Sequence, residues 1–246
     1  MDKLTKERNV LKIASSYLKE VYGNFEVDSS QTDNPDAALI LEDDDKKRII
    51  GIEITSIDKS SDNQYWNDEK SHRDIRIEQM NKCIEGRTPD NPLKRLNVEV
   101  GRTFIASRVV EIKGSKYNKY ISGERFEHVI LLVTSQFISA TFRYFKSYLV
   151  PWTNYLLSNL RFPYQKVIFV CVESGGCVLL YDALNPSKRQ PRIDKNKELG
   201  NTFINTGYIP TGGDFNMNNM HYKRALIPKP KPKPKPKPKP KPKPKK

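Results

Sequence analysis

The sequence predicts an α/β fold in which helices flank a mixed β-sheet. Segments with helical periodicity alternate with segments that have the composition of strands. Two strand pairs, at residues 36–55 and 166–183, have short polar connections typical of hairpins. A further apolar strand at 128–135 lies between helical segments. The order helix, strands, helix, strand, helix, strands favours one layered α/β domain.

Each element is predicted from the spacing of its apolar residues. In the first helix, for example, Val10, Ala14 and Leu18 recur at intervals of four residues. Pro151 interrupts a later helical region and suits the first turn of a helix better than its interior. In chain order we expect a helix at 4–22, strands at 36–41 and 48–55, helices at 64–85 and 103–120, a strand at 128–135, one or two helices within 137–160, and strands at 166–172 and 177–183.

Composition divides the 246-residue chain into three regions. Residues 1–182 carry the predicted elements, with a basic helical insert near 88–126. Residues 183–227 are poor in apolar side chains and are expected to form a loop-rich extension that packs on the core. Residues 228–246 are a Lys-Pro repeat that we expect to be disordered.

The positive charge of the chain is concentrated in that tail. The formal net charge is +14, and the tail holds ten lysines and no acid. Without them, 33 basic residues face 29 acidic residues, a net charge of +4. Alternating proline favours an extended polyproline II strip, which suits contact with a phosphate backbone. A stiff spacer and a solubilising end are the alternatives.

Other features exclude several classes of protein. The N-terminus is charged and lacks the apolar run of a signal peptide, and apolar stretches end at about eight residues, well short of a membrane span. The three histidines and three cysteines match no zinc spacing, and glycine-rich nucleotide loops are absent. We therefore expect a cytoplasmic protein without a membrane partner.

The hairpin at 36–55 carries the main functional evidence. Its second strand places three isoleucines on one face and Gly51, Glu53 and Thr55 on the other. Asp36 begins the neighbouring strand, so its carboxylate and that of Glu53 can converge on one ion. Carboxylates are the ligands that Mg²⁺ and similar cations prefer, and such ions promote phosphodiester hydrolysis. A solvent-exposed hairpin with acids at its ends is the simpler alternative.

The pattern Pro35-Asp36, then a strand and loop, then Glu53-Ile54-Thr55, resembles the PD-(D/E)XK nuclease superfamily. The resemblance implies the restriction-endonuclease-like αβββαβ core. It also implies that Asp36, Glu53 and the Ile54 carbonyl bind the metal ion, and that Glu20 of the first helix assists. The motif covers residues 4–86, and the order of elements extends it to 182.

Thr55 departs from the pattern of that superfamily, which has lysine at this position. A hydroxyl can hydrogen-bond a water molecule and help place the nucleophile, but it supplies no positive charge. Lys59, Arg76 and Gln79 are candidate substitutes, with Gln79 as a catalytic residue and Arg76 as a nucleic-acid contact. The loss of the lysine also fits a protein that binds without cutting.

The sequence thus predicts a metal-dependent endonuclease that hydrolyses DNA with Mg²⁺ or Mn²⁺, with RNA left open as a substrate and a homodimer left open as its assembly. Basic residues of the insert are expected to add phosphate contacts: Arg102, Arg108, Lys113 and Lys116. The alternatives are a catalytically inactive nucleic-acid-binding protein with the same fold, and an interaction protein that acts through its Lys-Pro tail.

Overall fold

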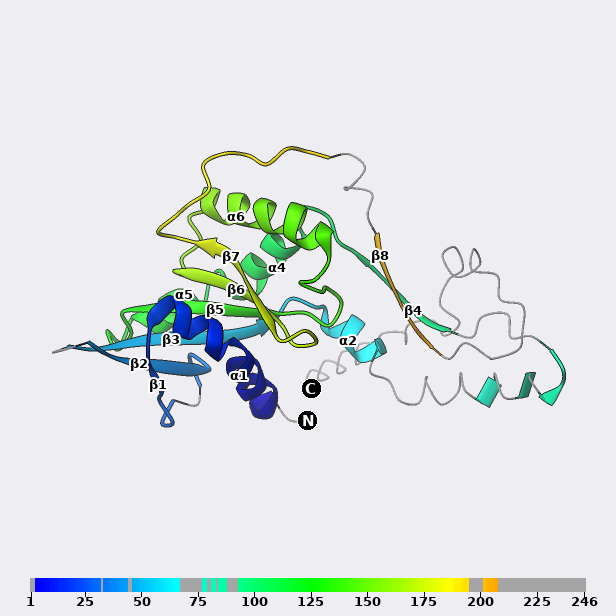
Figure 1. Cartoon of the computed structure of the whole chain (residues 1–246), viewed down its shortest axis with the longest axis horizontal. Coiled ribbons are helices and arrows are strands. Elements are labelled where there is room, and N and C mark those ends of the chain that lie inside the picture. The colour runs from blue at the N-terminus through cyan, green and yellow to red at the C-terminus, as the bar shows by residue number, and fades with distance from the viewer. Residues whose placement is uncertain are drawn as a thin grey trace, which may run out of the picture. The chain divides into compact units, whose positions relative to one another are not determined.

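The computed structural model describes residues 3–31, 33–43, 46–66, 77–78, 81–82, 84–87, 93–194 and 201–207. It confirms the α/β class, with a six-stranded mixed sheet flanked by helices (Figure 1). Contacts divide the chain into two units, residues 1–60 with 97–204 and residues 61–96 with 205–246. The six-stranded sheet belongs entirely to the first unit.

The expected strands appear in the predicted order, together with further elements that were not expected. In chain order the elements are α1 (Lys3–Tyr22), β1 (Glu26–Val27), β2 (Ala37–Asp43), β3 (Lys46–Ser56), α2 (Ser60–Trp66), β4 (Leu93–Glu99), α4 (Phe104–Lys113), α5 (Tyr117–Ile121), β5 (His128–Thr134), the π-helix η1 (Phe145–Leu149), α6 (Val150–Asn159), β6 (Lys166–Cys171), β7 (Gly176–Asp182) and β8 (Asn201–Gly207).

The main sheet has the strand order β1-β2-β3-β5-β6-β7. The strands β1, β2 and β3 pair antiparallel, β3, β5 and β6 pair parallel, and β7 returns antiparallel to β6. The parallel strands need long crossovers, which the helices α4, α5, η1 and α6 supply. A separate two-stranded sheet joins β4 to β8.

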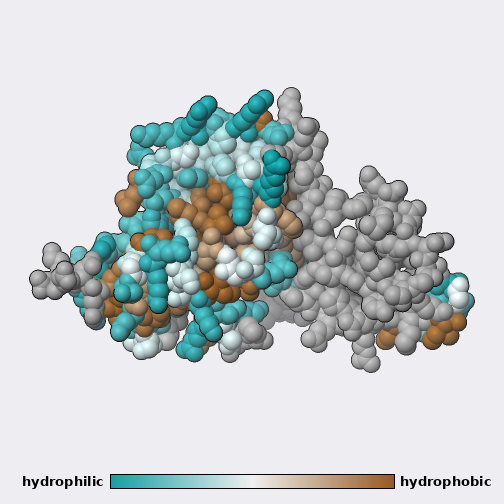
Figure 2. Space-filling view, in the orientation of Figure 1, coloured by the Kyte–Doolittle hydropathy of each residue, from teal (hydrophilic) through white to brown (hydrophobic). Residues whose placement is uncertain are grey.

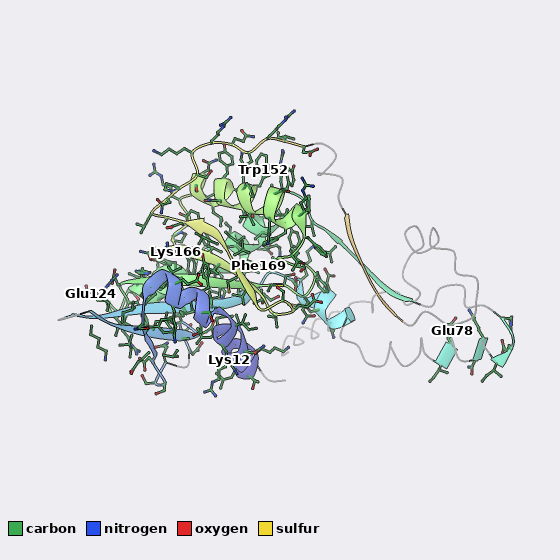
Figure 3. The ribbon with its side chains drawn as sticks, viewed as in Figure 1. Lys12, Glu78, Glu124, Trp152, Lys166 and Phe169 are labelled. Carbon is green, nitrogen blue, oxygen red and sulfur yellow. The ribbon has the colours of Figure 1, made fainter. Side chains whose placement is uncertain are left out.

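One face of the sheet packs against α1. The predicted isoleucine face lies here: Ile50, Ile52 and Ile54 join the core with Ala14 and Leu18 of α1. Ile50, Ile52 and both helix residues have no exposed surface. Lys12 lies on the exposed side of the same helix (Figure 3). The prediction that the apolar residues of α1 form one core-facing side of the helix is therefore confirmed.

The other face of the sheet carries the alternate side chains. Register places Thr55 of β3 beside Val133 of β5, and Val133 beside Phe169 of β6. The ring of Phe145, in η1, packs 4.8 Å from that of Phe169. The layer formed by α4, α5, η1 and α6 therefore covers the face that bears Gly51 and Glu53.

Several expectations change in detail. The helix expected at 103–120 is two helices, α4 and α5, because the chain turns between Gly114 and Lys116. The helix α2 (Ser60–Trp66) overlaps only the start of the helix expected at 64–85, and most of residues 67–85 lie outside the described residues. The strands β1, β4 and β8 were not expected. The Lys-Pro tail lies outside the described part of the chain. No helix that the structure describes has both the length and the apolarity to span a membrane.

Candidate active site

The structure brings Asp36 and Glu53 together on one face of the sheet. Ala37 pairs with Ile52, so Asp36, one residue earlier, stands across from Glu53 on the antiparallel partner strand. The Oδ2 atom of Asp36 accepts a hydrogen bond of 2.8 Å from the backbone N–H of Ile54. This bond holds Asp36 at the open end of the hairpin, beside Glu53.

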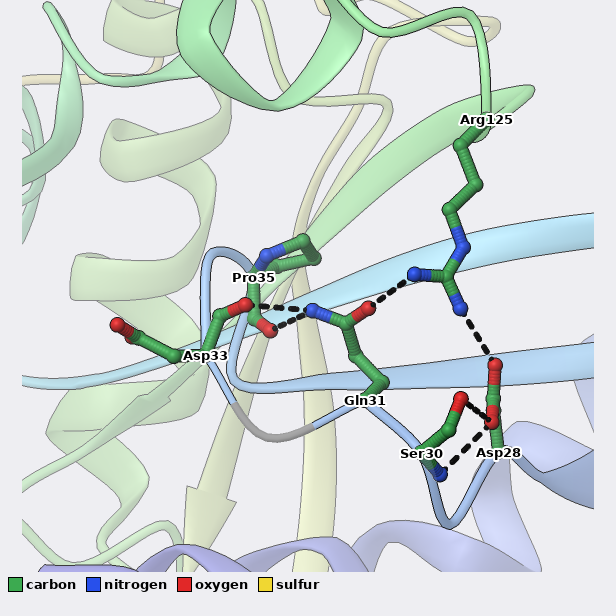
Figure 4. Close-up of polar contacts among 6 residues, drawn as sticks. All are labelled: Asp28, Ser30, Gln31, Asp33, Pro35 and Arg125. Atoms are coloured by element: carbon green, nitrogen blue, oxygen red, sulfur yellow. Dashed lines mark hydrogen bonds and ion pairs between the residues drawn. The ribbon is translucent and has the colours of Figure 1, made fainter.

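The loop before Asp36 is held by side chains (Figure 4). Arg125 donates from one nitrogen to Asp28, at 2.6 Å, and from another to the Gln31 side-chain oxygen, at 2.8 Å. The Gln31 amide in turn donates to the Pro35 carbonyl at 2.7 Å. The segment after α5 is thereby connected to the residue that precedes Asp36, and it restricts where that carboxylate lies.

Gly51 permits the close approach of Pro35 to the sheet. A Cβ atom at Gly51 would lie 2.9 Å from Cγ of Pro35, 3.1 Å from Cγ2 of Val129 and 3.4 Å from Cγ of Phe126. Real Cβ atoms do not come within 3.0 Å of such neighbours, so the proline would have to move. Glycine at this position is therefore a packing requirement of the site.

We expect Gly51→Ala to destabilise the protein by about 1–3 kcal/mol, because the added methyl group overpacks a buried position. The free energy of unfolding in urea measures the effect. Gly123→Ala is the matched control, since a Cβ atom there meets nothing within 4 Å, and it should change the stability by less than about 0.5 kcal/mol. Equal effects of the two substitutions would contradict the packing assignment.

Lys113, the last residue of α4, forms an ion pair with the Glu53 carboxylate. Both residues are buried, with Glu53 5% and Lys113 7% exposed. Lys113 was expected to contact phosphate, and the structure places it in the interior instead. A buried lysine is stable there only because the carboxylate compensates its charge.

Two tyrosines complete the surroundings of Glu53. The Tyr120 hydroxyl hydrogen-bonds the Glu53 carboxylate, and burial, together with the nearby charges of Glu53 and Asp36, raises the pKa of Tyr120. Burial and the neighbouring Tyr120 and Glu53 likewise raise the pKa of Tyr164. The fully buried hydroxyl of Tyr164 has no hydrogen-bond partner among the described residues. Both phenols therefore stay protonated, and Tyr120 donates to Glu53.

Thr55 lies half-buried, two residues beyond Glu53 and on the same face. Its backbone carbonyl accepts a hydrogen bond of 3.4 Å from the Thr134 hydroxyl. The positive charge that a threonine cannot supply comes to the site from Lys113 instead. The Ile54 carbonyl remains a predicted metal ligand, and the Ile54 amide holds Asp36.

Glu20 is not brought to this site. It is exposed on α1, and α1 packs against the isoleucine face of the sheet, opposite to Glu53. Burial raises the pKa of Tyr17 on the same helix, and the charge of Glu20 adds to that shift.

The basic insert is also used differently from the expectation. The Arg102 guanidinium lies 5.0 Å from the ring centroid of Trp152. Arg108 donates to the Ile57 carbonyl at 3.1 Å and pairs with Glu111, so it ties α4 to the end of β3. Lys116 alone of the four expected insert contacts is exposed. Arg76 and Gln79 lie outside the described residues.

The donor set fits a hard divalent cation. Mg²⁺ is commonly held by one or two carboxylates and keeps several water molecules, and Asp36 and Glu53 offer two carboxylates on adjacent strands. The orphaned Tyr164 hydroxyl provides a further polar atom within the electrostatic reach of both acids. Within the described ranges, no cluster of three or more acids, histidines or cysteines is present, so water would complete the coordination.

Sequence reasoning missed the roles of Lys113 and Tyr120, although one pattern was available. Ile105, Val109 and Lys113 follow each other at intervals of four and share the buried side of α4. A lysine in line with buried apolar residues requires a buried acid as its partner. Glu53, on a strand that is otherwise apolar, is the matching acid.

Comparisons with models of protein families, with curated proteins and with solved structures find no match for this chain. Its function is therefore inferred from its own residues.

Proposed function

We propose that the chain is a metal-dependent nuclease that hydrolyses phosphodiester bonds in DNA, with Asp36, Glu53 and Lys113 as its active-site residues. One observation carries the proposal: the Lys113 ammonium group pairs with Glu53 next to Asp36. Two carboxylates can hold a divalent cation, and a lysine beside them can stabilise the charge that develops during phosphoryl hydrolysis. Here the lysine comes from a helix and not from the strand.

The topology supports the same proposal. The chain passes from α1 through β1, β2 and β3, then through helices α4 and α5, to β5, which pairs parallel to β3. With α2 and β4 between β3 and α4 set aside as an insertion, this order is compatible with the αβββαβ core implied by the resemblance to PD-(D/E)XK nucleases. Asp36 lies at the start of the second strand and Glu53 lies in the third, as the motif requires. The short strand β1 is the first of the three.

In the proposed mechanism, Asp36 and Glu53 would hold Mg²⁺ or Mn²⁺, and the bound ion would supply an activated water and offset charge on the phosphate. Lys113 would place a positive charge next to the phosphate, where negative charge develops. Tyr120 donates to Glu53 and so restrains its orientation. Thr55 offers a hydroxyl that can hydrogen-bond the same water.

The origin of the lysine matters less than the position of its charge. A lysine side chain has four methylene groups, so its ammonium group can reach one point from different backbone positions. Thr55 and Gly51 have small side chains, and both lie on the face that Lys113 approaches. The threonine therefore leaves room for a lysine that arrives from α4.

The test is cleavage of linear, circular and single-stranded DNA, and of RNA, by the full chain with Mg²⁺, Mn²⁺ or EDTA. We expect metal-dependent cleavage of DNA that EDTA abolishes. Asp36→Asn should lower the rate about 100-fold or more, since it removes a metal ligand. Glu173→Gln, in the exposed β6–β7 turn, is the matched control and should cut normally. No cleavage by the wild type would support the non-catalytic binding protein instead, and normal cleavage by Asp36→Asn would show that the chemistry does not depend on this carboxylate.

A further inference from the structure

Two stretches of the first unit contain no acidic residue. No Asp or Glu occurs from residue 128 to 172, which includes η1 and α6, or from 183 to 193, which follows β7. Six cations in these stretches are exposed: Arg143, Lys146, Arg161, Lys188, Arg189 and Arg192. In a body whose charges otherwise nearly balance, this is a local excess of positive charge.

The fold places the two stretches side by side. The backbone N–H of Ser187 donates to the Ser158 hydroxyl of α6 at 2.9 Å. From this point the segment 183–194 runs along α6 (Figure 1). Hydrophilic residues form the surface along that edge of the molecule (Figure 2). We call the six exposed cations and the backbone that carries them the α6 basic surface.

The α6 basic surface belongs to the same layer as the proposed active site. Phe145, between Arg143 and Lys146 in sequence, packs on Phe169. Phe169 and Thr55 lie in the same row of side chains across the sheet, and their strands are separated by one strand. At about 4.8 Å between strands, that separation is roughly 10 Å. The helical segment that carries Arg143 and Lys146 is therefore packed on the same face of the sheet as Glu53 and Thr55.

Four of the six cations are arginines, whose planar guanidinium groups bind phosphate oxygens in pairs. We propose that the α6 basic surface binds the phosphodiester backbone of a nucleic-acid duplex and guides it to the site of Asp36 and Glu53. The identity of the ligand rests on the proposed nuclease function. The binding is independent of base sequence, because phosphate contacts carry no sequence information.

The surface replaces the insert as the main phosphate contact of the folded body. Of the four cations expected there, Lys116 is exposed, but Arg102 stacks over Trp152, Arg108 holds Ile57 and Glu111, and Lys113 pairs with Glu53. These last three side chains have partners within the protein. The six cations of the α6 basic surface point into solvent instead, and can meet an external anion without breaking an ion pair that the structure records.

The test is the affinity of the full chain for a fluorescent 20-base-pair DNA duplex, measured by anisotropy in EDTA at several salt concentrations. EDTA prevents cleavage, so this result is independent of whether the protein is a nuclease. Lys188→Gln/Arg189→Gln should weaken binding about tenfold and reduce the slope of log affinity against log salt by about 2. The Lys-Pro tail contributes equally to every variant.

Lys12→Gln/Lys19→Gln is the matched control, because it removes the same charge from exposed positions of α1 on the opposite side of the sheet. It should leave the slope within experimental error. Equal slopes for the wild type and for Lys188→Gln/Arg189→Gln would overturn the proposal. So would unchanged DNA binding by that variant with lost binding to phosphatidylglycerol vesicles, which would assign the surface to an anionic membrane.

Discussion

We expect Lys113→Met to lower the rate of metal-dependent DNA cleavage about 100-fold or more, the usual cost of removing a group that stabilises charge in the transition state. Methionine keeps most of the volume of the lysine stem and removes only the ammonium group. Thr55 cannot replace the lost charge. Single-turnover cleavage with saturating protein measures the chemical step and separates it from weaker binding.

The same substitution also affects stability. It leaves the Glu53 carboxylate buried without its cation, which typically costs about 3–5 kcal/mol. Urea unfolding therefore accompanies the activity assay. Glu53→Gln/Lys113→Met removes both charges and should recover most of that loss while remaining inactive. Normal cleavage by folded Lys113→Met would contradict the catalytic role of the lysine.

The second prediction concerns the position where the lysine is missing. We expect Thr55→Lys to restore at least about a tenth of wild-type activity to Lys113→Met, because it returns a positive charge to the face of Glu53 from the neighbouring strand position. Thr55 is half-buried, so the side chain of a lysine at this position has access to solvent. The measurement is again the single-turnover rate with Mg²⁺.

Ser56→Lys in the same Lys113→Met background is the matched control. Ser56 is exposed and its side chain points to the opposite face of β3, so its lysine should not rescue the activity. Recovery with both lysines would show a non-specific effect of charge. Failure of Thr55→Lys in a folded protein would show that the face near Glu53 is not where the lysine acts.

The sequence predicted the hairpin and its faces well because these depend on local regularities. The alternation of Ile50, Ile52 and Ile54 with Gly51 and Glu53 determines which side chains enter the core. The two-faced strand and the short loop then require Asp36 to stand across from Glu53. Both acids of the candidate site were identified on this basis.

The contribution of α4 was not predicted, because it depends on packing between residues far apart in the chain. Lys113 and Glu53 are 60 positions apart, and no local pattern in the β-hairpin identifies its partner. The arginines of the insert were expected to contact phosphate because they are charged, yet they contact a ring and a carbonyl from other elements. Short pairings such as β1 with β2 are likewise determined by tertiary contacts and not by strand propensity.

The most direct test of the active site is the Mg²⁺-dependent cleavage rate of Glu53→Gln beside that of the wild type. Glutamine keeps the size of the side chain and its hydrogen bond with Tyr120, but it removes the charge that pairs with Lys113 and that the proposal assigns to cation binding. We predict a loss of about 100-fold or more in a folded protein. Cleavage by Glu53→Gln at the wild-type rate would show that the chemistry takes place elsewhere or belongs to a contaminant.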